Sequence, residues 1–330
     1  MAVTIALAGD TMLGRGVAET LAHKKPHHLF SPAIERIAGG ADLFLLNLEC
    51  CVSDRGSRID VPGKPFFFRA PPRAAAVLAD LGVDVASLAN NHALDYGPEA
   101  LLDTRDHLGR AGIRTLGAGA DVGEARAPLV LEAGGLRIGI LAVTDHPPEY
   151  AAGPGRPGVA YANLWDEDVP AWLTDAVRAL AARTDLVLVS VHWGPNMTSR
   201  PVAHVSGAAP ALTAAGADLV VGHSAHVFHG FTRHVLYDLG DFIDDYAVHP
   251  ALRNDLGLLW LVTLDEHGPV RTEAVPVALD YCHTRLANDA EYAWIADRLG
   301  EACAELGTQG VTDEGDRLSV DWSRSLARAS

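Results

Sequence analysis

Residues able to hold a metal ion recur in this sequence where apolar, strand-like runs end. The side chains are carboxylates, amides and imidazoles, a donor set that suits Mn, Fe or Zn, and one or two divalent ions are expected. In chain order the candidates are Asp10, then Asn47 and Glu49, then Asn90, Asn91 and His92, then His192, and finally His223 and His226.

Each of these residues, taken singly, also has an ordinary structural interpretation. An Asp after a strand, such as Asp10, is often a turn residue or a helix cap, and Asn47 and Asn90 are residues that commonly close turns. A lone loop histidine is more often hydrogen-bonded or solvated than metal-bound. Five strand ends that all carry suitable ligands favour a metal site over coincidence.

Short apolar runs alternate with helical stretches, which predicts an α/β fold. Several expected strands begin at Asp and continue without polar alternation, as strands covered on both faces do. In an open parallel sheet the carboxyl ends share one edge, so the candidate ligands are expected to gather there. The expected strands are Val3–Ala8, Asp42–Asn47, Asp84–Leu88, Leu136–Val143, Asp185–Val191 and Asp218–Val221, and the helices are Pro72–Leu81, Pro98–Ala111, Asp168–Arg183 and Val202–Ala215.

The pattern changes after about Asp245. Leu256–Leu264 and Val270–Leu279 read as a hairpin, and Pro276 predicts that the second strand lies at a sheet edge or is interrupted. A helix at about Asn288–Leu306 and a polar tail follow. We expect one domain, with a catalytic core over residues 1–245 and C-terminal strands and helix over residues 246–330 that complete it.

Composition limits the possible partners. The 330 residues carry 26 Lys plus Arg against 42 Asp plus Glu, a formal charge of −16, which disfavours nucleic acid. The four cysteines show no metal or disulfide spacing and are expected to be free thiols. The N-terminus reads as a core strand with no signal or membrane segment, so a cytoplasmic protein that acts on a peptide or small molecule is expected. The sequence carries no signal for an oligomeric state.

Six segments, taken together, resemble the CapA-like family of capsule and poly-gamma-glutamate synthesis proteins, within the calcineurin-like metallophosphoesterase superfamily. They are Gly9-Asp10-Thr11-Met12-Leu13-Gly14-Arg15, Asn47-Leu48-Glu49, Ala89-Asn90-Asn91-His92-Ala93-Leu94-Asp95-Tyr96-Gly97, His192-Trp193-Gly194, Gly222-His223-Ser224-Ala225-His226-Val227 and Leu239-Gly240-Asp241-Phe242. The resemblance implies a β-sandwich flanked by helices, with metals at its edge.

The resemblance also implies roles for single residues. Asp10, Glu49, Asn91, His192 and His226 correspond to metal ligands, with His223 in the same final motif, and His92 resembles the histidine that assists the leaving group in phosphoesterases. Two departures weaken that activity. Met12 stands where the superfamily generally has His, and His223 and His226 are one residue further apart than in His-x-His.

These departures favour another branch that the chain resembles, the peptide epimerases of lasso-peptide pathways, which invert an α-carbon beside a metal-bound carbonyl. In this hypothesis His283 exchanges the proton with Asp10 or another acid, although a hydrogen-bonded histidine at a strand end explains His283 equally well. Candidate substrate-binding residues are Arg15, Asn90 and Trp193. The alternatives are a metal-dependent phosphoesterase and a non-catalytic component of polymer synthesis.

One further aspartate, Asp95, precedes the helix expected near Pro98, and its sequence position predicts a helix cap.

Overall fold

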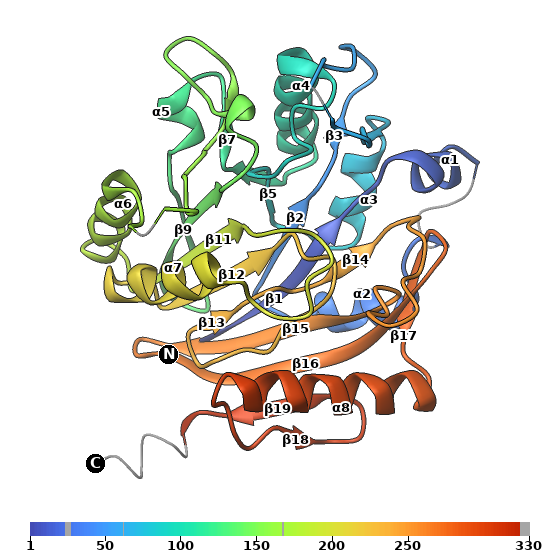
Figure 1. Cartoon of the computed structure of the whole chain (residues 1–330), viewed down its shortest axis with the longest axis vertical. Helices are drawn as coiled ribbons and strands as arrows, with labels where there is room; N and C mark the ends of the chain where they lie inside the picture. Colours follow the sequence, from blue (N-terminus) through green and yellow to red (C-terminus); the bar gives the residue numbers. More distant parts are fainter. Residues whose placement is uncertain (24–27, 62, 167, 324–330) are drawn as a thin grey trace.

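In a computed structural model of the chain, residues 1–23, 28–61, 63–166 and 168–323 are described, and they form two β-sheets packed face to face (Figure 1). The larger sheet has the order β18-β19-β16-β15-β1-β2-β5-β6, with β14 paired to β1 and β17 paired to β16. Its strands are β1 (Ala2–Thr11), β2 (Leu43–Leu48), β5 (Val85–Ser87), β6 (Arg114–Leu116), β14 (Asp241–Ile243), β15 (Leu256–Asp265), β16 (Gly268–Asp280), β17 (His283–Leu286), β18 (Thr312–Asp313) and β19 (Leu318–Asp321).

The second sheet has the order β13-β12-β11-β9-β8. Strands β9, β11 and β12 run parallel to one another, while β8 forms an antiparallel pair with β9. The strands are β8 (Leu129–Ala133), β9 (Leu136–Thr144), β11 (Leu186–His192), β12 (Leu219–His223) and β13 (Val235–Leu236). Two short pairs stand apart, β3 (Cys51–Val52) with β4 (Arg69–Ala70) and β7 (Ala118–Gly119) with β10 (Gly158–Val159).

The core lies between the sheets because alternate residues of each strand point inward. In β1, Ile5 and Leu7 join the core between the sheets, while Ala6 and Ala8 face the helices outside. This two-residue period with both faces buried explains the unbroken apolar runs in the sequence.

Helices cover the outer faces of both sheets (Figure 1). The larger sheet is covered by α1 (Arg15–His23), α2 (Pro32–Ala38), α3 (Ala74–Asp80) and α4 (Gly97–Arg110), and the second by α6 (Ala171–Ala181) and α7 (Ala203–Ala214). Helix α8 (Asp289–Glu305), at the bottom of the view, packs Ile295, Leu299 and Cys303 against the core near β15 and β16. Two short helices, α5 (Val122–Ala125) and the 3-10 helix η2 (Pro148–Tyr150), complete the chain. The α/β sandwich flanked by helices is thereby confirmed.

Most predicted elements match observed ones within a few residues, but three expectations were wrong. The candidate ligands do not follow one sheet edge, because β1, β2 and β5 belong to one sheet and β11 and β12 to the other.

Pro276 lies within a continuous, internal strand. One side of β16 pairs with β19 over Arg271–Ala274 and with β17 over Val277–Asp280, so Pro276 lies where the neighbouring strand changes and a missing N–H is tolerated.

The segment after α8 is not simply a polar tail. Leu318–Asp321 adds β19 to the sheet, and Trp322 packs in the core. Residues 324–330 of the expected tail lie outside the described residues.

All four cysteines are buried and free, in agreement with the prediction. No helix within the described ranges is long and apolar enough to cross a membrane.

Candidate metal centre and adjoining pocket

Strand pairing brings the carboxylates together. β14 lies parallel to β1 with Asp241 opposite Asp10, and β2 places Asn47 opposite Asp10 on the other side. Glu49 follows β2 directly, while His192 and His223 end the neighbouring strands β11 and β12 of the second sheet. The ligand candidates therefore meet where the ends of both sheets converge.

Two groups of three side chains have ligand atoms within 4.8 Å of one another, and both contain Asp10. The first is Asp10, Glu49 and His192; the second is Asp10, His226 and Asp241. All five side chains are buried. A carboxylate shared by two groups is the arrangement that a pair of ions would use.

The donor set fits a cation because its buried atoms lack other partners. Buried polar atoms are normally hydrogen-bonded, so a cluster of unpaired ones requires an explanation. In and beside the two groups, the unpaired atoms are both oxygens of Glu49, His192 Nε2, His223 Nδ1 and Asp241 Oδ2. Oδ1 of the predicted ligand Asn91 is also buried without a partner among the described residues. Oxygen and imidazole nitrogen atoms of this kind are the ligands that Mn, Fe and Zn accept. The cluster is therefore suited to hold a metal ion.

Asp10 is held in place by groups that do not compete for an ion. Asn47 Nδ2 donates to Asp10 Oδ1 at 2.7 Å, and the backbone N–H of Ser224 donates to Oδ2 at 3.0 Å. Asn90 Nδ2 in turn donates to Asn47 Oδ1 at 3.1 Å. Such outer hydrogen bonds fix the orientation of a ligand, and they assign Asn47 and Asn90 a supporting position.

His226, which follows β12, and Asp241, at the start of β14, lie close enough to share a proton. His226 Nδ1 lies 2.8 Å from Asp241 Oδ1 and 3.5 Å from Asp10 Oδ2. Burial lowers the pKa of His226, but Asp241 and Glu49 outweigh burial and raise it well above its usual value. Burial also raises the pKa of Glu49 well above the ordinary range, and the neighbouring Asp10 adds to this. The metal-free cluster therefore retains protons that a bound cation would displace.

Two histidines of the second sheet are neutral, as metal ligands must be. Burial lowers the pKa of His223 to about 4 and that of His192 well below its usual value. His223 Nε2 lies 3.1 Å from Ser190 Oγ, which leaves Nδ1 pointing toward Asp10 Oδ1 at 3.6 Å.

Met12 takes no part in the cluster. Its sulfur accepts a hydrogen bond from the backbone N–H of Gly14 at 3.0 Å, and its side chain is buried in the helix-facing core. Asp241, which the sequence pattern does not indicate as a ligand, supplies a carboxylate to the cluster instead. The segment Leu239–Phe242 was recognised as a motif, but its pairing with β1 is a long-range contact that local patterns do not specify.

Beside the cluster lies a histidine–aspartate pair. His92 Nδ1 lies 2.6 Å from Asp95 Oδ2, and Asp95 Oδ1 accepts from the hydroxyl of Tyr150 at 3.0 Å. Lys64 Nζ lies 3.1 Å from Asp95 Oδ1 and 3.4 Å from His92 Nδ1. The expectation that Asp95 caps α4 was wrong, because Tyr96 is the N-cap residue and Asp95 faces inward.

A pocket of about 370 Å³ opens onto His92 and His226. Its other described lining residues are Arg15, Phe66, Phe68, Asn196, Met197, Tyr246, Ala247 and Asn254. Phe68 stacks on His92 with ring centroids 4.1 Å apart, and Tyr246 meets His226 edge-on at 5.4 Å. The lining is thus mainly aromatic and amide, and it includes His226 of the candidate metal centre.

A model of the bacterial capsule synthesis protein PGA_cap family matches residues 4–246. The chain belongs to this family. Among its relatives, the probable polyglutamine synthesis accessory protein of Mycobacterium tuberculosis is 29% identical over 96% of each chain. The PGA biosynthesis protein CapA of Bacillus subtilis is 25% identical over 88% of this chain and 80% of that protein. The predicted CapA-like relationship is confirmed.

Solved structures are more distant. A putative 5'-nucleotidase from Staphylococcus aureus, in complex with alpha-ketoglutarate, has a TM-score of 0.48 and 12% identity over 90% of this chain and 58% of that chain.

The PGA_cap match contains every member of the cluster and the pocket residues up to Tyr246, whereas His283 lies beyond it. The structure does not bring His283 into the pocket lining. Its Nδ1 lies 2.8 Å from the backbone oxygen of His28, in strand β17.

Of the candidate substrate-binding residues, Arg15 lines the pocket, but Asn90 and Trp193 are not among the described lining residues. The Trp193 indole is buried behind the second sheet, where its Nε1 donates to the backbone oxygen of Tyr237 at 3.0 Å.

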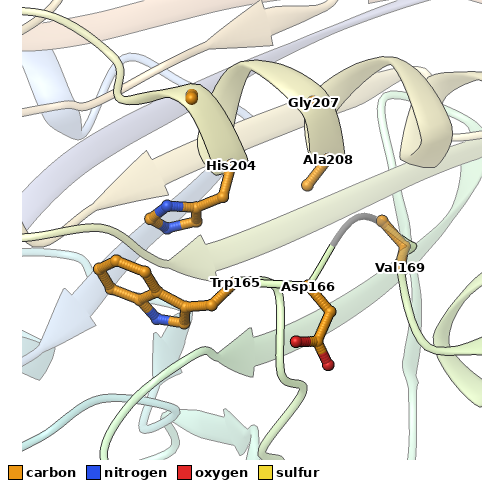
Figure 2. Close-up of a pocket in the computed structure, with 7 residues that line it drawn as sticks. Trp165, Asp166, Val169, His204, Gly207 and Ala208 are labelled. Atoms are coloured by element: carbon orange, nitrogen blue, oxygen red, sulfur yellow. The ribbon is translucent and has the colours of Figure 1, made fainter.

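A second cavity, of about 410 Å³, opens beside α7 (Figure 2). Trp165 stacks on His204 there with ring centroids 3.9 Å apart, while Asp166, Val169 and Ala208 form the other side. His204 Nε2 lies 3.0 Å from Asp145 Oδ2, so this histidine is tied to a buried carboxylate behind the cavity.

Proposed function

We propose that this PGA_cap family member is a metal-dependent enzyme in which His92 accepts a proton from a carbonyl-containing, peptide-like substrate. The observation that carries the proposal is the buried His92–Asp95 pair, which borders the pocket next to the unpaired ligand atoms. A base held by a carboxylate beside a cation site is a recurring arrangement for acid–base catalysis.

The protonation state of His92 supports the role of a base. Burial lowers the pKa of His92 to about 4, although Asp95 acts in the opposite direction, so the imidazole is neutral near pH 7. Because Nδ1 lies against Asp95, the second nitrogen, Nε2, is the one left to accept a proton. A phosphoesterase acid would need the protonated form at that point.

A divalent ion held by Asp10, Glu49, His192, His226 and Asp241 would polarise the substrate carbonyl and so acidify the adjoining C–H bond. Asp95 keeps His92 oriented, and Lys64 holds Asp95. The rings of Phe68 and Tyr246 place apolar surface directly beside His92 and His226 in this pocket.

Inversion of the carbon also requires a donor on the opposite face. The Tyr246 hydroxyl is buried without a partner among the described residues, and burial among carboxylates raises its pKa well above the ordinary value, so it remains a proton donor. We assign the C–H proton to His92 Nε2 and the returning proton to Tyr246. Tyr246 thereby replaces His283 as the candidate partner.

The test is hydrogen exchange at the α-carbon. The Mn-loaded protein is incubated in D2O with blocked peptides, and deuterium at the α-carbon and the D/L ratio are measured. We expect exchange that is lost in His92→Ala, exchange with reduced inversion in Tyr246→Phe, and no change in the matched control His283→Ala. Absence of exchange across a broad peptide set would refute the proposal.

A second candidate, metal-dependent phosphoester hydrolysis, is favoured by one observation. Asp10 belongs to both groups of candidate ligands, which is the arrangement that a pair of ions would use to clamp a phosphoryl group. Turnover of an aryl phosphate by the Mn-loaded protein, abolished by His92→Ala, would support this candidate over proton exchange at carbon.

The names of the relatives favour a third candidate, an accessory protein in the synthesis of a glutamate polymer. A non-catalytic accessory would keep its role in polymer-producing cells when Asp10 and His226 are both replaced by Ala, whereas an enzyme would lose it.

A further inference from the structure

Large apolar side chains are exposed around the mouth of the His92 pocket. Phe66 is 55% exposed, Val248 53% and Tyr281 73%. Phe66 lines the pocket, Val248 follows the lining residue Ala247, and Tyr281 comes from the turn between β16 and β17. These three residues, here called the rim, come from segments far apart in the sequence.

The position of Tyr281 follows from its contact with Gly16. A Cβ on Gly16 would lie 2.5 Å from the Tyr281 hydroxyl oxygen and 3.1 Å from Asp245 Oδ2. Asp245 is the partner of Arg15, which lines the pocket. Phe66 thus lines the pocket itself, while Tyr281 lies beside Gly16, the chain neighbour of the lining residue Arg15, and Val248 is the chain neighbour of the lining residue Ala247.

The cation at this mouth is already neutralised. Arg15 Nη2 lies 2.5 Å from Asp245 Oδ1 and its Nε lies 3.1 Å from Oδ2. The same guanidinium lies 5.6 Å from the ring centre of Phe66 and 5.5 Å from that of Tyr246. Arg15 is the one Lys or Arg among the described lining residues. Apart from the proposed divalent ion, the described lining residues offer a polyanion no unpaired Lys or Arg side chain, and the chain carries a formal charge of −16.

Asn196, an uncharged polar residue of the lining, is suited to bind a peptide bond. Asn196 is exposed at the pocket and can both donate to and accept from a peptide bond. Asn254, in contrast, is already engaged, because its Oδ1 accepts from the backbone N–H of His249 at 2.7 Å. An exposed amide beside aromatic rings recognises an uncharged peptide segment better than a carboxylate chain.

We infer that the substrate is a polypeptide segment with an apolar side chain at or next to the reacting residue, bound across the rim, and not a glutamate polymer. This inference rests on the proposed function for the reacting centre. It differs from what the names of the relatives suggest, because the rim and the paired Arg15 favour apolar over acidic chains.

Binding to a variant that lacks the base tests this inference separately from the chemistry. The probes are blocked pentapeptides of glycine with leucine, phenylalanine, lysine or glutamate at the centre, and a γ-linked glutamate pentamer. Affinity is measured on Mn-loaded His92→Ala, which keeps the rim. We expect the leucine and phenylalanine peptides to bind about ten-fold or more tightly than either glutamate probe.

Rim variants then locate the binding. Phe66→Ala and Tyr281→Ala, each combined with His92→Ala, should weaken the apolar peptides several-fold. The matched control is Trp165→Ala, which removes an aromatic ring of similar exposure, 54%, at the second cavity (Figure 2) and should leave affinity unchanged.

Three outcomes would overturn the inference. The first is that the glutamate probes bind as tightly as the apolar peptides or more tightly. The second is that Trp165→Ala weakens the apolar peptides as much as the rim variants do. The third is that Phe66→Ala changes the protein from dimer to monomer in sedimentation, which would assign the rim to a second copy of the chain. If apolar peptides bind at the rim but show no α-carbon exchange with the unmodified protein, the proposed function fails while this inference stands.

Discussion

Glu49 should destabilise the metal-free protein and stabilise the metal-bound one. Its carboxylate is fully buried, neither oxygen has a hydrogen-bond partner, and the nearest imidazole nitrogens, of His192 and His226, lie 3.9 and 4.0 Å away. An unsatisfied buried polar atom costs about 1–3 kcal/mol. Burying Glu49 requires either an unpaired charge beside Asp10 or the uptake of a proton, whereas the isosteric Gln is neutral in both states, so we expect metal-free Glu49→Gln to be more stable by about 1–2 kcal/mol near neutral pH.

The sign of the pH dependence follows from the raised pKa. Because folded Glu49 holds its proton more tightly than the unfolded chain, the metal-free protein loses stability as the pH rises above the ordinary value of 4.5 toward the folded pKa. Below that value the carboxyl is protonated in both states, and the advantage of Gln disappears. The advantage of Glu49→Gln should therefore be larger at pH 8 than at pH 4.5.

Bound metal should reverse the order of stability, so that the unmodified protein becomes more stable than Glu49→Gln. An ion at 100 times its dissociation constant stabilises the folded state by about 2.7 kcal/mol, and the variant should lose most of this. Urea unfolding in EDTA and in MnCl2 measures both effects, and Glu266→Gln, at an exposed carboxylate, is the matched control. The reasoning is refuted if Glu49→Gln gains as much stability from Mn as the unmodified protein, or if it is the less stable protein in EDTA.

Three further predictions concern neighbouring parts of the structure. Asp95→Asn should lower the rate of the His92-dependent reaction about 100-fold or more with little change in metal content. An unchanged rate in this variant would contradict the role of Asp95 in orienting His92. Trp193→Phe removes the hydrogen bond to the backbone oxygen of Tyr237 and should cost about 1 kcal/mol in urea unfolding without altering substrate affinity; weaker substrate binding would instead place this residue in the pocket. Trp322→Ala, in the core beside β19, should cost about 3–5 kcal/mol, whereas an unchanged unfolding midpoint would show that the C-terminal strand is dispensable.

The sequence predicted the elements well because strands buried on both faces leave unbroken apolar runs. The runs that became β1 and β11 carry no period-two alternation, since inner and outer faces are both apolar. For the same reason they do not indicate to which sheet each belongs, and the prediction of one shared edge failed. The short strand β19 has only Leu318 and Val320 as apolar residues, too little to predict a strand.

The candidate site was recovered in part from residue types at strand ends. Asp10 and Glu49 were selected because carboxylates follow apolar runs, but Asp241 begins its strand and joins the cluster only through pairing with β1. Asp95 looked like a helix cap because its environment, a buried contact with His92, is not visible in local sequence. His283 was selected from the resemblance to epimerases, without a motif that fixes the path of the C-terminal segment.

The central claim is that the buried cluster around Asp10 holds a divalent ion. Elemental mass spectrometry of the purified, Mn-loaded and dialysed protein measures this directly, beside the double variant Asp10→Ala, His226→Ala and the control His283→Ala. We predict one or two bound transition-metal ions per chain, lost in the double variant and retained in the control. Absence of metal from the unmodified protein, or equal metal in all three proteins, would contradict the account.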